Sequence, residues 1–258
     1  MTTGRTPGKA APREERRFDN TYLTPDTHEV HRDYLAHAFR WGFAHRFCKG
    51  ERVLDVGCGA EWPLGQVLQN HGNLGIRAEK YVGVDAGPKP KEKRTILADL
   101  WPDFSFGERW QELVATYGKF GVVCSFEVIE HCDLADGKLI LAGIRGCVKD
   151  DGIVLLSTPV NDGHRQARNH IHEWGTEELA AALATAGLRV ERSFGTFADV
   201  SRVRKAIKDA GRADHLQTWE DLREWFSDDV LSCFLAPLYP EVAKNRLHVC
   251  RPWKEEEE

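Results

Sequence analysis

Short apolar runs alternate with amphipathic stretches along most of the chain, and this alternation indicates the fold. The apolar runs are rich in β-branched residues, as buried strands are. The stretches between them carry apolar residues three and four positions apart, which predicts helices. Strands that alternate with helices in this way form βαβ units, so the pattern predicts an α/β fold with a parallel sheet flanked by helices. The predicted strands are 52–56, 80–85, 94–99, 120–126, 152–159, 188–194 and 246–250.

Two parts of the chain fall outside this alternation. Residues 1–20 are polar and basic, which predicts a disordered leader. Residues 21–258 are expected to form one domain that begins with a helical extension over 21–50. Residues 198–244 show helical patterns without a strand signal, so we interpret them as a helical insertion or lid before the last strand. One predicted helical face of this insertion is basic, typical of a solvated surface but also compatible with a nucleic-acid contact. Its residues are Arg202, Lys205, Lys208 and Arg212.

Composition narrows the class of protein. The 258 residues are 41% hydrophobic and 29% charged, as in globular proteins, and the net charge of -5 gives no overall attraction to nucleic acid. The seven cysteines are scattered and form no CxxC pair, which favours reduced thiols. No apolar run reaches membrane-spanning length, and the N-terminus lacks the apolar core of a signal peptide. We therefore expect a soluble, cytoplasmic protein without a membrane partner.

The turn after the first strand indicates a cofactor site. Asp55 precedes Gly57 and Gly59, and two glycines directly after a strand let a ligand approach the backbone. Trp62 stands where a dinucleotide-binding loop has its third glycine, and no Gly-Lys-Ser/Thr follows, which disfavours nicotinamide, flavin and nucleoside triphosphate. Asp85 and the acid at position 99 also end predicted strands. An acid ahead of the turn favours a cofactor with a cationic group.

Five motifs in order resemble those of class I S-adenosylmethionine-dependent methyltransferases. They are VLDVGCG at 53–59, YVGVDAG at 81–87, ILADL at 96–100, VVCSFEVIEH at 122–131 and DDGIVLLSTP at 150–159. The resemblance covers about residues 50–200 and the last strand. It implies a three-layer sandwich with a mostly parallel seven-stranded sheet, the last strand antiparallel, and S-adenosyl-L-methionine as cofactor.

The same resemblance implies a role for each motif. Gly57 and Gly59 would lie against the amino-acid moiety of the cofactor, with Asp55 compensating its ammonium group. Asp85 would accept hydrogen bonds from the ribose hydroxyls, a role that suits a carboxylate. Asp99 would bind the adenine amine while Leu100 covers the ring. The complete predicted cofactor site is Asp55, Gly57, Cys58, Gly59, Asp85, Ala86, Asp99, Leu100, Ser125 and Glu127.

The acceptor side is less defined by sequence. Methyl transfer to a hydroxyl or amine needs a base near the acceptor, and a neutral imidazole titrates in the useful range. We predict His131 or His170 as the base, with Glu130 beside them at the carboxyl edge of the sheet. The HxxEW pattern that starts at His170 resembles methyltransferases that act on sugars and other small molecules, so we favour a small-molecule or glycan acceptor. Arg165 and Arg168 would neutralise an acidic substrate.

Two alternatives remain open. ExxEH at 127–131, followed by STP and HIHEW, is similar to small-RNA 2′-O-methyltransferases of the Hen1 type, in which two Glu and two His bind a divalent metal. The matching positions here are Glu127, Glu130, His131 and His170, but the fuller HxDHxFEW form is absent. We therefore do not favour a metal, although nucleic acid stays possible as a partner. The other alternative is a non-catalytic module that keeps the S-adenosylmethionine fold without transfer.

Overall fold

The structure is a computed structural model that describes residues 32–59, 63–70, 78–87, 98–101, 103–106, 108–161, 163 and 167–253. Several sequence predictions therefore lie outside the described residues. These are the leader over 1–20, the replacement of the third glycine by Trp62, and the substrate contact of Arg165.

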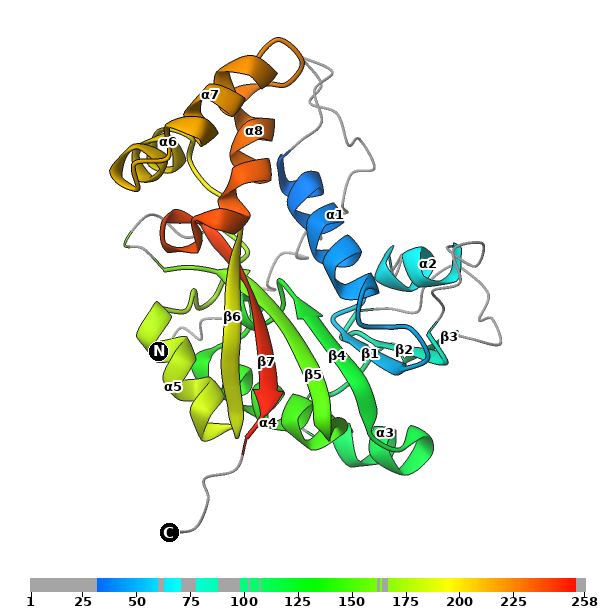
Figure 1. Cartoon of the computed structure of the whole chain (residues 1–258). Helices are drawn as coiled ribbons and strands as arrows, with labels where there is room; N and C mark the ends of the chain where they lie inside the picture. The colour runs from blue at the N-terminus through cyan, green and yellow to red at the C-terminus, as the bar shows by residue number, and fades with distance from the viewer. Residues whose placement is uncertain are drawn as a thin grey trace, which may run out of the picture.

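Seven strands form one sheet in the order β3-β2-β1-β4-β5-β7-β6. The first five strands in chain order pair in parallel, whereas β7 is antiparallel to both β5 and β6. This arrangement, seen in Figure 1, confirms the predicted fold class, including the antiparallel last strand. The strands are β1 (Arg52–Val56), β2 (Lys80–Val84), β3 (Ala98–Trp101), β4 (Phe120–Phe126), β5 (Val148–Pro159), β6 (Leu188–Phe197) and β7 (Asn245–Pro252).

The predicted boundary of the third strand was wrong. We expected it to end at Asp99, but β3 continues to Trp101, and Asp99 pairs in register with Val82 rather than with the last residue of β2. The strand continues because Leu100 is 3% exposed and Trp101 packs against the core, so burial extends the strand beyond the acid. The position of Asp99 within the strand changes its expected role, as described below.

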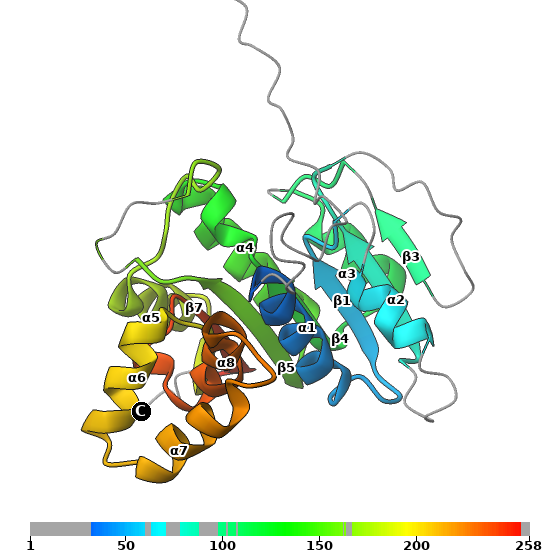
Figure 2. The same cartoon turned by 90° about the horizontal axis from the view of Figure 1, so that it is seen from above.

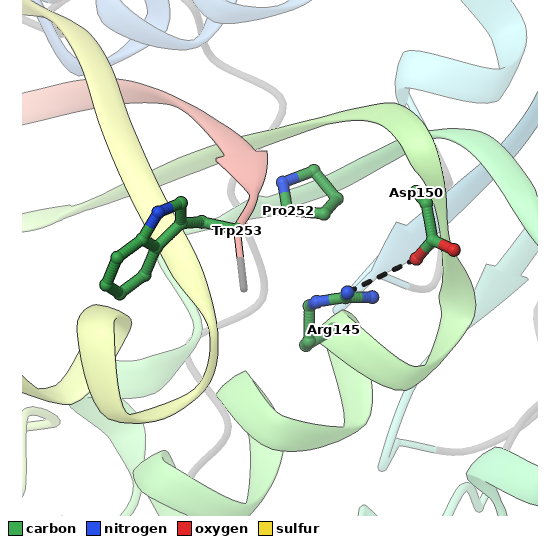
Figure 3. A pocket seen from close by; sticks show the side chains of 4 residues that line it. All are labelled: Arg145, Asp150, Pro252 and Trp253. Atoms are coloured by element: carbon green, nitrogen blue, oxygen red, sulfur yellow. Dashed lines mark hydrogen bonds and ion pairs between the residues drawn. The ribbon is translucent and has the colours of Figure 1, made fainter. Parts of the chain in front are cut away.

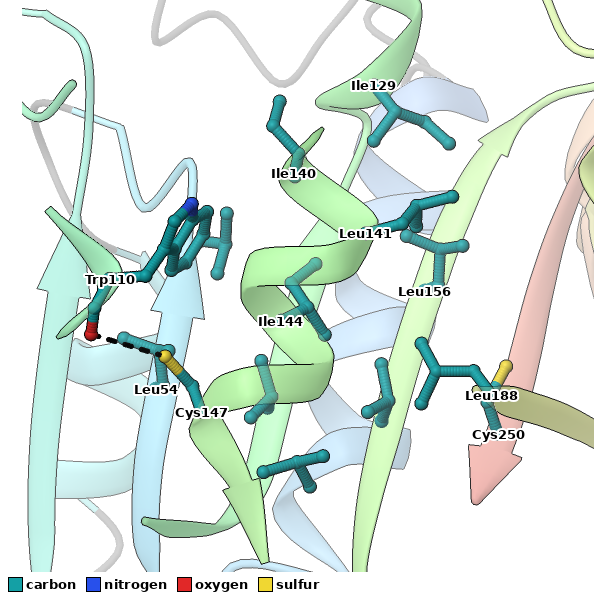
Figure 4. Close-up of a cluster of buried hydrophobic side chains, with 14 of the residues drawn as sticks. Leu54, Trp110, Ile129, Ile140, Leu141, Ile144, Cys147, Leu156, Leu188 and Cys250 are labelled. Carbon is teal, nitrogen blue, oxygen red and sulfur yellow. Dashed lines mark hydrogen bonds between the residues drawn. The ribbon is translucent and has the colours of Figure 1, made fainter. Parts of the chain in front are cut away.

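Helices cover both faces of the sheet. On one face, α3 (Trp110–Tyr117), α4 (Leu134–Cys147) and α5 (Thr176–Thr185) bury their apolar sides in a large core, part of which Figure 4 shows. On the other face, α1 (Arg32–His45) and α2 (Pro63–Asn70) pack over a second core. Pro63 opens α2, because a proline fits the first turn of a helix.

Three further helices follow β6 and precede β7 along the chain. They lie above the carboxyl ends of the parallel strands (Figures 1 and 2). They are α6 (Val200–Asp209), α7 (Ala213–Leu222) and α8 (Asp228–Leu235), followed by short 3₁₀ turns at Ala236–Leu238 and Pro240–Val242. This helical insertion has a small core of its own, centred on Trp219. Three of the four residues of its predicted basic face pair with local acids, as Arg212 does with Asp214 at 2.8 Å, which fits a solvated surface.

None of the helices in the described ranges is long and apolar enough to cross a membrane. All seven cysteines are free thiols, and only Cys132 among them is more than slightly exposed. The absence of disulfides agrees with the prediction made from the scattered cysteine positions.

Candidate active site

The glycine turn after β1 is held against its neighbours and is open on one side. Gly57 and Gly59 have φ angles of 74° and 70°, a region that favours glycine. The backbone N–H of Gly57 donates to the carbonyl of Val84 at 2.8 Å. A Cβ on Gly57 would collide with Val128, whereas a Cβ on Gly59 would meet no atom of the described residues within 4 Å. The turn therefore touches the segment after β4 and leaves space for a ligand above Gly59.

The carboxylate of Asp85 is fixed at the same edge of the sheet. Its Oδ2 accepts the backbone N–H of Gly59 at 2.8 Å, and its Oδ1 accepts that of Gly87 at 2.7 Å. Each carboxylate oxygen keeps a further lone pair, so the fixed group can still accept two hydroxyl hydrogen bonds. Ala86, between Asp85 and Gly87, is exposed. The structure thus brings Asp85 and the glycine turn together as the sequence predicts.

Asp55 lies beneath the turn rather than beside the open space. Its side chain is buried, and Tyr81 donates its hydroxyl to Asp55 Oδ2 at 2.7 Å. Burial raises the pKa of Asp55 to about 7, and the nearby charge of Asp85 acts in the same direction, whereas the Tyr81 hydrogen bond opposes both. The sequence analysis missed Tyr81, although a tyrosine within an otherwise apolar strand signals a buried hydroxyl that needs a partner.

Asp99 does not reach the carboxyl edge of the sheet. Its Oδ2 lies 3.1 Å from Lys80 Nζ and accepts the hydroxyl of Tyr117 at 3.0 Å. Leu100 points into the α1–α2 core, in the same cluster as Cys58. The expectation that the strand presents Asp99 and Leu100 to the adenine at its end therefore rests on the wrong strand boundary.

Asp103 is the acid that follows β3 at this edge, and the sequence analysis missed it. Its backbone N–H donates to the carbonyl of Gly87 at 3.0 Å, and the N–H of Phe104 donates to the carbonyl of Asp85 at 2.8 Å. The side chain of Asp103 is exposed, and its φ is 50°. The sequence signal was Pro102, because a proline is a more reliable strand terminator than an acid.

Glu127 holds three elements together. Its Oε1 accepts Arg40 Nη1 from α1 and the hydroxyl of Ser157 from β5, each at 2.8 Å, and its Oε2 accepts the side-chain amide of Asn245 from β7. Its φ of 58° is unusual for a residue with a side chain. Arg40 was not predicted, although it lies between Ala36 and Ala44 on the buried stripe of α1. Both oxygens of Glu127 are therefore engaged.

Ser125 is the second-to-last residue of β4 and pairs with Val56 of β1. It is fully buried, and its hydroxyl has no hydrogen-bond partner among the described residues.

Glu130, His131 and His170 form a compact group of titratable side chains at this edge. One ligand-type atom from each of them lies within 4.8 Å of the other two. The first two belong to a 3₁₀ turn at Ile129–His131, and the third belongs to the loop after β5. Glu130 is 0% exposed, and Thr158 donates its hydroxyl to Glu130 Oε2 at 3.1 Å. Burial raises the pKa of Glu130 well above its usual range, and the charge of Glu127 adds to this shift.

The loop that carries His170 is attached directly to the 3₁₀ turn. The N–H groups of Ile171 and His172 both donate to the carbonyl of Glu130, at 2.7 and 3.2 Å, and Trp174 Nε1 donates to the carbonyl of Ile129 at 3.3 Å. The rings of His131 and His170 meet edge to face, with centroids 5.2 Å apart. The structure thus joins two motifs that the sequence separates by about 40 positions.

A hollow of about 250 Å³ lies at the opposite edge of the sheet, between the end of α4 and the end of β7 (Figure 3). Arg145 and Asp150 form an ion pair of 3.2 Å at its wall, beside Pro252 and Trp253. Its position near the amino ends of the parallel strands separates it from the glycine turn, so it is not part of the candidate site.

Comparison with known proteins agrees with this geometry. A family model described as a methyltransferase domain matches residues 28–193. A Mycolicibacterium smegmatis protein named probable S-adenosylmethionine-dependent methyltransferase is 28% identical over 164 residues, which cover 60% of this chain and 58% of that protein. The chain therefore spans less than two thirds of the relative's length.

Solved structures share the fold at low identity. A SAM-dependent methyltransferase from Archaeoglobus fulgidus has a TM-score of 0.54 and 15% identity, over 86% of this chain and 94% of that one. The [4+2]-cyclase SpnF has a TM-score of 0.51 and 14% identity, over 86% and 81%. The second example shows that this fold also serves other reactions, so the fold alone does not define the activity.

Because the family model matches more than half of the chain, the chain belongs to the methyltransferase-domain family. Its strand order and flanking helices are those of the class I S-adenosylmethionine-dependent methyltransferases.

Proposed function

We propose that the protein transfers the methyl group of S-adenosylmethionine to an oxygen or nitrogen atom of a small-molecule or sugar-like acceptor. The observation that carries this proposal is the contact between two sites. Val128 touches the glycine turn, and Glu130 and His131 lie two and three positions after Val128. The cluster of Glu130 with the two imidazoles therefore adjoins the proposed cofactor site. A donor pocket and a group of proton acceptors at one edge are what methyl transfer requires.

The donor pocket is proposed to use the groups that the backbone fixes. Asp85 would accept both ribose hydroxyls on its remaining lone pairs, and the open side of Gly59 would admit the methionine part of the cofactor. Asp103 replaces Asp99 as the proposed acid near the adenine, because it follows β3 and bonds to the loop of Asp85. Asp55 would act on the cofactor ammonium group only through the turn or a water molecule.

His170 is the proposed general base, with His131 beside it. The Nδ1 of His170 lies 2.6 Å from Oε1 of the buried Glu173. An ionised carboxylate only accepts hydrogen bonds, so in the neutral imidazole Nδ1 carries the proton and Nε2 keeps a lone pair for the acceptor. Glu173 thus orients the imidazole in the way that a base requires.

RNA methylation of the Hen1 type is the second candidate, because three of its four matching positions lie together. Glu127 is not available as the fourth, since Arg40, Ser157 and Asn245 occupy its oxygens. Arg202, Lys205 and Arg212 of the helical insertion also pair with acids, which weakens the case for a nucleic-acid surface there. These two observations support the small-molecule acceptor over RNA.

Calorimetry with S-adenosylmethionine tests whether the protein binds the proposed methyl donor. A methyl-transfer assay is needed as well, because the non-catalytic alternative also predicts binding. Wild-type protein should bind the cofactor, and it should then label one class in a screen of glycans, metabolites and RNA with methyl-labelled donor. Cofactor binding without label in any class would support the binding-module alternative. Label confined to RNA would overturn the small-molecule proposal.

A further inference from the structure

We propose that Glu130, His131 and His170 form a binding site for one divalent transition-metal cation, with three protein ligands and an open side. The ligand atoms would be Glu130 Oε1 and the Nε2 atoms of the two histidines. Formation of this site does not depend on methyl transfer. Only the chemical use of the cation rests on the proposed function.

The first observation is the state of the two imidazoles. His131 Nδ1 lies 3.0 Å from the backbone carbonyl of Asn169, and His170 Nδ1 lies 2.6 Å from Glu173 Oε1. Both partners are acceptors, so in the neutral imidazoles both Nδ1 atoms carry the proton and both Nε2 atoms present lone pairs. A histidine that donates its second N–H to a carbonyl or carboxylate is the usual form of a metal-bound histidine.

The second observation is the unpartnered oxygen of a buried carboxylate. Glu130 is 0% exposed, and its Oε1 has no hydrogen-bond partner among the described residues, although Thr158 satisfies Oε2. A buried polar atom without a partner costs about 1–3 kcal/mol, and more if it is charged. Oε1 lies 3.8 Å from His131 Nε2, so this oxygen faces the histidines. A cation between these atoms would supply the missing partner.

The third observation is the separation of the site into closed and open sides. Glu127 next to it is engaged by three protein partners and contributes no ligand atom. The side chain of His131 is 40% exposed, so the cluster is accessible from solvent on that side. Three protein ligands with an open position are typical of metal sites that also bind a substrate.

The donor set indicates which ions fit. Two imidazoles and one carboxylate suit zinc, manganese, cobalt or ferrous iron, whereas calcium and magnesium prefer oxygen ligands alone. When bound, such a cation would lower the pKa of an acceptor hydroxyl that coordinates it. In that state the histidines serve as ligands, and Glu173 and Asn169 position them.

The test uses the full chain, freed of metal with a chelator, and titration calorimetry with Zn²⁺, together with the electron paramagnetic resonance signal of added Mn²⁺. We expect one saturable site per chain. His131→Ala and His170→Ala should each lower affinity at least 100-fold, and Glu173→Gln about tenfold, the range seen for residues that orient a ligand. The matched control is His172→Ala, because His172 belongs to the same loop but bonds to Glu178 and should leave affinity unchanged.

The proposal is overturned if wild-type protein shows no stoichiometric binding, or if the double variant His131→Ala/His170→Ala binds as wild type does. Circular dichroism of each metal-free variant checks that it is folded. Glu130→Gln provides a second route if a histidine variant unfolds, since it keeps the shape of the side chain and should still abolish the site. Failure of the proposed function appears separately, as loss of S-adenosylmethionine binding or of methyl transfer with the metal site intact.

Discussion

The guanidinium of Arg40 lies 2.8 Å from Oε1 of Glu127, although 87 positions separate the two residues. Arg40 is 2% exposed, so this ion pair joins α1 to the segment between the cofactor turn and the imidazole cluster within the interior. The charge of Arg40 also acts on Glu130, where it opposes the rise in pKa. One buried cation therefore stabilises the acids on the segment after β4.

Loss of this cation should be strongly destabilising. Arg40→Met should lower the free energy of unfolding by about 3–5 kcal/mol, the range for removing one partner of a buried ion pair. The double variant Arg40→Met/Glu127→Gln should recover part of this loss, because it no longer buries an unpaired carboxylate. Urea unfolding of these two variants and of the single variant Glu127→Gln measures the coupling, and strictly additive effects would contradict it.

Asp85 and Asp99 should differ sharply in their effect on cofactor binding, because Asp85 follows β2 whereas Asp99 lies within β3. Asp85→Asn should weaken S-adenosylmethionine binding by about 10- to 100-fold, as expected for the loss of hydrogen bonds to a charged acceptor. Asp99→Asn is the matched control and should have little effect, since Lys80 and Tyr117 bind its carboxylate. Equal losses in calorimetry would show that the motif, and not the strand boundary seen here, locates the adenine.

Gly57 and Gly59 should separate stability from binding. Both have positive φ, so alanine at either position costs about 1–2 kcal/mol. Gly57→Ala should cost more, because its Cβ collides with Val128. Gly59→Ala should keep most of the stability but lower cofactor affinity, since its methyl group projects into the open space. Thermal unfolding and calorimetry on the two variants would contradict this if their order of stability were reversed.

Asp55 should make stability depend on pH. Its pKa is about 7 in the folded state and 3.8 in its unperturbed form, so between these values the folded chain holds the extra proton. Its contribution is therefore present at low pH and lost as pH rises from about 4 to about 7. Relative to wild type, Asp55→Asn should thus gain about 3 kcal/mol of stability between pH 5 and pH 8.

The comparison with Asp55→Asn is needed because other buried groups act in the opposite direction. Burial lowers the pKa of His37 to about 3 and that of His248 to about 4. Their stabilising contribution is lost as pH falls below about 6.5, in the same range. Denaturant unfolding of both proteins at pH 5, 6.5 and 8 isolates the Asp55 contribution as the difference. A constant difference at all three values would contradict the raised pKa.

The sequence was sufficient for those features that depend on the local chain. The strand–helix alternation and the turn at Gly57 and Gly59 depend on periodicity and on φ angles that few residues adopt, so they were predictable. The approach of His170 to His131 was also expected, because both follow strands that end at one edge. The end of β3 was not, since burial of Leu100 and Trp101 outweighed the acid at position 99.

Partnerships across the fold were beyond the sequence. Nothing near Glu127 indicates that Arg40 and Asn245, from opposite ends of the chain, bind its carboxylate. In the same way, the apolar strand around Tyr81 does not reveal that its hydroxyl serves Asp55. Such pairs depend on three-dimensional packing, and a single sequence does not show which distant residues come into contact.

The two ends of the helical insertion meet. Phe197 at the end of β6 pairs with Asn245 at the start of β7, and the N–H of Lys244 donates to the carbonyl of Phe197 at 2.9 Å. The segment between them has its own small core, so it is joined to the sheet like the tip of an enlarged hairpin. Its attachment is not limited to this neck, because α8 also contacts α1 and β6. The insertion therefore ties the N-terminal helix to the antiparallel edge of the sheet, and a change in its packing would reach α1 as well as the two strands.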